Sequence, residues 1–135
     1  MRLGLWAVFP KEDEGFAGFV ALMHPGWLPS DAHRVEVGWR LARSGWGRGY
    51  ATEAGRAALA VGFGQLGLPE VVSLIHPDNR RSIAVAERLG LTLERTATHP
   101  TDGQPISVYR LGREEWSGAI HPSPRPGRRG QSSQT

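Results

Sequence analysis

The chain has 135 residues, 39% of them hydrophobic, with no cysteine and a formal net charge of +3. We expect a single domain, since this length supplies one modest core; the missing cysteines exclude disulfides, thiolate metal sites and a cysteine nucleophile. No apolar run is long enough to span a bilayer and no secretory signal is recognisable, so a cytoplasmic protein without membrane contact is expected.

The positive charge is confined to the C-terminal end. Residues 1–116 hold 13 basic and 13 acidic side chains, whereas residues 117–135 hold three arginines and no acid. This last segment is rich in Pro, Gly, Ser and Gln, and it cannot offset its ordering entropy by burial. We therefore expect a domain at 1–116 and a disordered tail at 117–135. Three arginines neutralise few phosphates, so a nucleic-acid partner is disfavoured.

Three apolar runs open the chain. Leu3–Phe9 and Phe16–Leu22, separated by a charged turn, predict an antiparallel hairpin, and the turn-forming residues 24–33 predict a loop whose Trp27 packs back over the sheet edge. Val35–Leu41 predicts a third strand. Its alternation places Val35, Val37, Trp39 and Leu41 on one face and Glu36, Gly38 and Arg40 on the other.

Alternating glycines follow the third strand, at Gly45, Gly47 and Gly49. Such glycines leave successive N–H groups uncovered, so that these groups converge on an anion at the start of the next helix, and phosphate is the obvious candidate. The Walker A loop is excluded because Gly49 is followed by Tyr-Ala. The dinucleotide fingerprint is excluded because one residue, Arg48, separates the last two glycines.

A helix is predicted from Tyr50 to Gly67. Glycines inside it each cost roughly 1 kcal/mol relative to alanine, so tertiary packing must hold the helix in place. Val71–Ile75 predicts a buried strand parallel to the third one, which completes a βαβ unit. A second helix starting at Asp78-Asn79 and ending at Gly90 follows. The runs Leu91–Thr96 and Ile106–Leu111 predict a closing hairpin.

Two separated motifs carry a family resemblance. The Gly-x-Gly-x-Ala loop that opens a helix, and Asn79-x-x-Ser82 followed by Leu89-Gly90-Leu91, resemble the GNAT N-acetyltransferases over about residues 5–116. The stretch Trp46–Ala54 is similar to the Rim-type branch, which acetylates ribosomal-protein N-termini and many small amines. The resemblance implies an α+β (mixed α/β) fold with a largely antiparallel sheet and a central βαβ unit, splayed between the strands ending at Leu41 and Ile75.

The same resemblance implies acetyl-CoA as the co-substrate, a primary amine on a small molecule or a protein N-terminus as its partner, and no metal. Pantetheine lies in the splay, and Asn79 either hydrogen-bonds it, caps its own helix, or does both. The implied contacts are backbone groups near Leu41 and Arg43 for the pantetheine and the N–H groups of Trp46, Gly47, Arg48, Gly49, Tyr50 and Ala51 for the pyrophosphate.

The implied reaction is direct attack of a neutral amine on the thioester. Glu36 is the candidate base, against the alternative of a solvated strand carboxylate. Ser82 is a candidate proton donor to the departing thiolate, or else a helix-capping serine, and Tyr109 is a second candidate donor, or else a core tyrosine. His76 either touches substrate or is a strand-end turn residue; the five histidines form no metal-ligand pattern.

The chain departs from the family at its N-terminus, where a strand and two helices are expected ahead of Leu5. We therefore expect a truncated form whose first strand is an exposed edge, available for a homodimer. The alternative to an active enzyme is a non-catalytic acyl-CoA-binding remnant or a half-domain that needs a partner chain. Ser44 stands where many members of the wider superfamily place Gln or Arg, so Arg43 or Arg48 would supply the phosphate charge.

Overall fold

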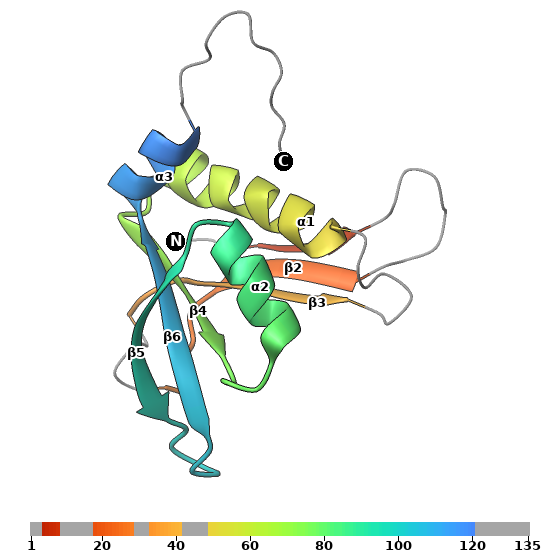
Figure 1. Ribbon diagram of the computed structural model, residues 1–135. Helices are drawn as coiled ribbons and strands as arrows, with labels where there is room; N and C mark the ends of the chain where they lie inside the picture. The colour runs from red at the N-terminus through yellow and green to blue at the C-terminus, as the bar shows by residue number, and fades with distance from the viewer. Residues whose placement is uncertain (1–3, 9–17, 29–32, 42–48, 121–135) are drawn as a thin grey trace, which may run out of the picture.

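The computed structural model describes residues 4–8, 18–28, 33–41 and 49–120, and Figure 1 shows their arrangement. The strands are β1 Leu5–Val8, β2 Gly18–Met23, β3 Glu36–Leu41, β4 Glu70–Ile75, β5 Thr92–Thr98 and β6 Pro105–Gly112. The helices are α1 Tyr50–Leu59, its π-helical continuation η3 Ala60–Gln65, α2 Arg80–Arg88 and α3 Arg113–Ile120. No helix within these ranges is long and apolar enough to cross a membrane.

The strands form one mixed sheet in the order β1-β2-β3-β4-β6-β5. Every neighbouring pair is antiparallel except β3 and β4, which are parallel and are connected through α1 and η3. This topology confirms the predicted opening hairpin, the central βαβ unit and the closing hairpin. The β1 strand lies at one edge of the sheet, as expected.

The sheet opens between its two parallel strands. Strands β2 and β3 are paired along six residues, whereas β3 and β4 share the single pair Glu36 and Val72, beside a hydrogen bond of 2.9 Å from the Val72 amide to the Val35 carbonyl. Beyond this point the two strands diverge, as Figure 1 shows. The predicted splay is therefore confirmed, and it leaves backbone groups of β3 and β4 without strand partners.

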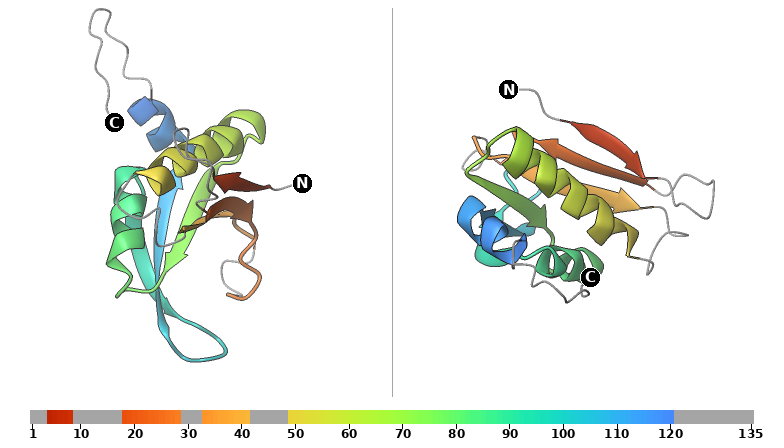
Figure 2. Two further views of the ribbon diagram at one scale, coloured as in Figure 1. Left: turned by 90° about the vertical axis from the view of Figure 1, so that its right-hand side faces the viewer. Right: turned by 90° about the horizontal axis from the view of Figure 1, so that it is seen from above.

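The core lies between the sheet and the helices α1 and α2, which cover the same face (Figure 2). Val35 and Val37 point into it, and Trp39 packs against it, as the alternation predicted. The two helices approach closely at Gly55, where a Cβ atom would lie 2.6 Å from Leu89 Cδ1. This close approach explains why a residue that disfavours helix stands in the middle of α1.

Helix α3 was not predicted, and it crosses the expected domain boundary at residue 116. Its first turn is stabilised by Glu115, whose Oε1 accepts a hydrogen bond of 2.7 Å from the Gly112 amide. Trp116 stacks on the core residue Phe63 with ring centroids 5.1 Å apart. Regular structure therefore continues to Ile120, into the segment expected to be disordered, because capping and an aromatic anchor hold this turn. Residues 121–135 lie outside the described residues.

Candidate active site

A cleft of about 650 Å³ lies where β3 and β4 part. Its walls come from β2, β3, β4 and the first turn of α2, so it brings together segments that are far apart in the sequence. Glu36, Asn79 and Ser82 line it, whereas Tyr109 is not among its lining residues. Three of the predicted residues therefore meet at one site, and its position coincides with the splay.

Glu36 is buried at the point where the parallel strands separate. Its side chain is flanked by β2, where Met23 is its register partner, and by β4, where the Leu74 amide donates to Glu36 Oε2 at 3.4 Å. Burial raises the pKa of Glu36 to about 7, and the hydrogen bond from Leu74 opposes this shift in part. The alternative of a solvated strand carboxylate is therefore wrong, because the neighbouring strands cover this position and leave it 8% exposed.

The first turn of α2 shows which of the two candidate residues, Asn79 or Ser82, caps the helix with its side chain. Asn79 is the N-cap residue, and its Oδ1 accepts a hydrogen bond of 3.2 Å from the Ser82 amide. The capping side chain is therefore that of Asn79 rather than that of Ser82. Both residues also line the cleft, so capping does not remove either of them from the site.

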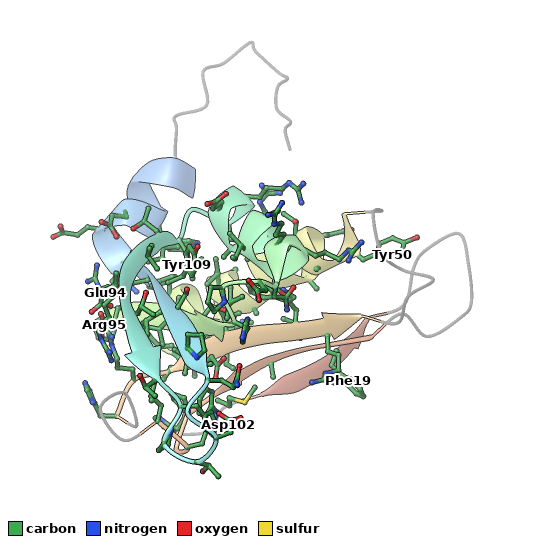
Figure 3. The ribbon with its side chains drawn as sticks, turned by 60° about the horizontal axis from the view of Figure 1, so that its bottom comes forward. Phe19, Tyr50, Glu94, Arg95, Asp102 and Tyr109 are labelled. Carbon is green, nitrogen blue, oxygen red and sulfur yellow. The ribbon has the colours of Figure 1, made fainter. Side chains whose placement is uncertain are left out.

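Tyr109 lies on β6 in the main hydrophobic cluster and is 7% exposed. Figure 3 shows it on the side of the sheet that the helices cover, away from Phe19 on β2, which is one of the cleft residues. Its surroundings are those of a core tyrosine. The structure thus places Tyr109 in the core and not in the lining of the cleft.

His76 lines the cleft but is engaged on both ring nitrogens. Its Nδ1 accepts a hydrogen bond of 3.1 Å from the Asp78 amide, and its Nε2 lies 3.3 Å from Gln104 Oε1. An Nδ1 that accepts leaves the proton on Nε2, which then donates to Gln104. In this tautomer neither nitrogen has a lone pair to offer a substrate. The strand-end turn interpretation of His76 fits these contacts.

The N-terminus of α1 fits an anion. Gly49 precedes the helix with φ +76° and carries no side chain that would cap it. The first intrahelical bond runs from the Glu53 amide to the Gly49 carbonyl, so the amides of Tyr50 and Ala51 have no helical acceptors. Of the predicted phosphate ligands, Arg43, Trp46, Gly47 and Arg48 lie outside the described residues, as does the side chain of Leu41.

Thr52 was missed by the sequence reasoning. Its Oγ1 is buried in the first turn of α1 and has no hydrogen-bond partner among the residues that the structure describes. A buried hydroxyl without a partner is rare, and this one lies in the first turn of α1, beside the amides that have no helical acceptors. The sequence feature that could have revealed Thr52 is its position three residues after Gly49, the last glycine of the loop.

Comparison with known proteins identifies the family. The model of the acetyltransferase (GNAT) domain matches residues 1–92. The chain belongs to the GNAT family. Among curated proteins, the chain is 41% identical over 107 residues to the uncharacterised Bacillus subtilis protein YkkB, covering 79% of this chain and 60% of YkkB. It is also 35% identical over 96 residues to the Aspergillus fumigatus FsC-acetyl coenzyme A-N(2)-transacetylase, covering 67% of this chain and 41% of that protein.

Solved structures agree with this assignment. An acetyltransferase from Agrobacterium tumefaciens has a TM-score of 0.67 and 37% identity, with 81% of this chain and 60% of that chain covered. A GNAT-family acetyltransferase from Bacillus anthracis has a TM-score of 0.69 and 23% identity, with 82% and 67% covered, and it supports the fold alone. The predicted GNAT fold is confirmed. The chain spans about 60% of the length of YkkB and of the Agrobacterium protein.

Proposed function

We propose that this GNAT chain transfers an acetyl group from acetyl-CoA to a primary amine by direct attack on the thioester. The observation that carries the proposal is the Glu36 carboxyl, buried in the cleft at the splay with its pKa raised to about 7. A base with this pKa is divided between its two protonation states near neutral pH, which suits proton transfer in either direction. Family membership supplies the reaction class.

Glu36 and Ser82 take part in proton transfer in the proposed reaction. The Glu36 carboxylate accepts a proton from the attacking amine while the nitrogen forms a bond to the carbonyl carbon. The carbon–sulfur bond then breaks, and the departing thiolate takes a proton, which we assign to the Ser82 hydroxyl because Ser82 lines the cleft. The proton held by Glu36 then passes through water to the Ser82 oxygen, so both side chains return to their starting states. Tyr109 remains the second proposed donor, and Ser82 is preferred because it lines the cleft, whereas Tyr109 lies in the hydrophobic cluster.

Acetyl-CoA supplies the acetyl group and the activated carbonyl. The free amides of Tyr50 and Ala51 and the Thr52 hydroxyl would hold its pyrophosphate at the α1 N-terminus, together with the preceding loop at 46–49. Asn79, which lines the cleft, and the backbone near Leu41 and Arg43 would contact pantetheine. The Thr52 hydroxyl, which has no hydrogen-bond partner among the described residues, supports this placement.

The kind of acceptor, the oligomeric state and the location of the protein are also proposals. An amine acceptor is supported by the name of the Aspergillus relative, FsC-acetyl coenzyme A-N(2)-transacetylase. A Rim-like acceptor, such as a protein N-terminus, rests on the stretch Trp46–Ala54. A homodimer through the β1 edge rests on the position of that strand in the sheet. The cytoplasmic location remains a prediction from the sequence.

Two measurements together test the proposal: calorimetric titration of the full chain with acetyl-CoA, and thiol release with a panel of amines and peptides. We expect binding and amine-dependent thiol release. Binding without release for any acceptor would instead support the non-catalytic acyl-CoA-binding remnant. Failure to bind acetyl-CoA at all would contradict both.

Thr52→Val tests the donor end of the site. Because valine has nearly the same shape and removes an unpaired buried hydroxyl, we expect the free protein to become slightly more stable. Acetyl-CoA affinity should fall roughly 10- to 100-fold, as for the loss of one hydrogen bond to a charged group. The matched control is Thr96→Val at an exposed position on β5. An unchanged affinity in Thr52→Val would remove Thr52 from the site.

A further inference from the structure

Beyond Glu36, the cleft has an apolar wall. Phe19, Met23 and Trp27 line it with exposed fractions of 41%, 40% and 39%, which is unusual for large apolar side chains gathered at one place. Strand alternation puts Phe19 and Met23 on the sheet face opposite α1 and α2, the same face as Glu36. Figure 3 shows Phe19 pointing away from the helices.

Contacts within and beside the wall hold two of its side chains in place. The Trp27 indole stacks on the His99 imidazole, with centroids 4.7 Å apart and planes inclined by 20°. Between Phe19 and Met23, the register pair of Ala21 and Gly38 carries almost no side-chain volume. The Met23 methyl lies over this pair, 3.5 Å from the position that a Gly38 Cβ would take, and Glu36 Oε2 lies 4.0 Å from the same position, so the wall reaches the Glu36 carboxyl. The volume of the cleft lies in the range of small-molecule sites.

The charges that line the cleft are few and not predominantly acidic. Among the lining residues that the structure describes, Glu36 carries the acidic group and Arg40 the basic one. A polyamine would bring several ammonium groups to this wall, where Glu36 is one carboxyl and Arg40 repels them. An amine with one nitrogen and an apolar body matches both features of the site.

A further inference, about the acceptor, rests on the proposed acetyl transfer. We propose that the acceptor is a monoamine with an aromatic or aliphatic body, which packs against Phe19, Met23 and Trp27 while its amino nitrogen reaches Glu36. The apolar wall then determines specificity through KM. Acetyl-CoA binds at the other end of the cleft, so the wall does not affect its affinity.

The test compares phenethylamine with spermidine, using the full chain at saturating acetyl-CoA and measuring thiol release. We expect kcat/KM for phenethylamine to exceed that for spermidine by roughly 10-fold or more, the scale of discrimination by apolar contacts. Trp27→Ala should raise KM for phenethylamine by about 10-fold and leave the acetyl-CoA affinity unchanged. Met23→Ser is the second wall variant, in case the first does not fold.

The matched control is Leu93→Ala, which removes an apolar side chain that is 55% exposed and lies outside the cleft, and which should change neither KM nor affinity. Arg40→Glu should raise the spermidine-to-phenethylamine ratio of kcat/KM. A preference for spermidine in the unaltered chain, or unchanged phenethylamine KM in both wall variants, would overturn the inference.

The inference about the acceptor and the proposed acetyl transfer can fail independently of each other. If thiol release is absent with every amine, calorimetric titration of the coenzyme A complex with each amine still decides the inference. Tighter binding of phenethylamine, weakened in Trp27→Ala, supports the apolar wall even though the proposed function has failed. Equal or tighter binding of spermidine overturns the inference whether or not acetyl transfer occurs.

Discussion

Two glutamates on the same sheet face have opposite surroundings. Glu36 lies at the open end of the β3–β4 pair, with a single backbone amide near its carboxyl, and burial raises its pKa to about 7. Glu70 lies two residues before Val72, the register partner of Glu36, and is bound by two arginines. Arg34 contributes most to lowering the pKa of Glu70 to about 2, burial opposes this, and Arg110 adds to it.

The geometry explains the difference. Arg34 Nε lies 3.0 Å from Glu70 Oε2, and Arg110 Nε lies 2.6 Å from Glu70 Oε1, so this carboxylate is held where β4 is paired with β6. At Glu36 the strands part, and among the described residues its pKa is set by burial and by the Leu74 amide, with no contribution from an arginine. An ion-paired carboxylate stabilises the fold, whereas a buried one without a counter-charge lowers stability when ionised but remains available for proton transfer.

The largest expected effect is on catalysis. Glu36→Gln removes the proposed base while keeping the shape of the side chain, and kcat/KM corrected for amine ionisation should fall by roughly 100-fold or more. Calorimetry should show unchanged acetyl-CoA affinity. Glu87→Gln, which changes an exposed carboxyl on α2, is the control for loss of an acidic group. An unchanged corrected rate in Glu36→Gln would show that Glu36 is structural.

The next effect is on stability, and its sign follows from the raised pKa of Glu36. The unfolded chain ionises near 4.5 and the folded one near 7, so ionisation progressively favours unfolding between these pH values. Glu36→Gln should therefore raise the free energy of unfolding by up to roughly 3 kcal/mol above pH 7, with the gain vanishing below pH 4.5. Urea unfolding at pH 4 and pH 8 measures this. A loss of stability at pH 8 would contradict the burial argument.

Glu70→Gln should act in the opposite direction and less strongly. The lowered pKa of Glu70 contributes stability that is present above pH 4.5 and is lost as pH falls toward 2. At pH 7 we expect a loss of roughly 1 kcal/mol, discounted for partial exposure of the pair. Glu94→Gln changes a more exposed carboxylate that lies 2.9 Å from Arg34, and it should lower the free energy of unfolding by less. Equal losses in the two variants would remove the distinction between Glu70 and its neighbour.

The sequence predicted those parts of the fold that rest on local pattern. The period of two in Val35–Leu41, the glycines after it and the Asn79-x-x-Ser82 turn predicted the βαβ unit and the position of the splay. Helix α3 was missed because its first turn adjoins a polar tail and is held by Glu115 and by stacking of Trp116 on Phe63, a contact distant in sequence.

The site was predicted less completely, because burial depends on neighbouring strands. Alternation along one strand assigned Glu36 to the polar face, but the residues that bury its side chain belong to the neighbouring strands β2 and β4. The apolar wall combines β2 with Trp27, and no single segment reveals it. Tyr109 was transferred from the family resemblance without a local pattern to support it, and the structure places it in the core.

The pH dependence of acetyl transfer tests the central claim most directly. For the unaltered chain, log kcat/KM corrected for ionisation of the amine should rise with pH and level off near 7, because Glu36 must be deprotonated to accept the amine proton. In Glu36→Gln this inflection should disappear and the corrected rate should be low at every pH. An inflection near 7 that persists in Glu36→Gln would contradict the assignment of Glu36 as the base.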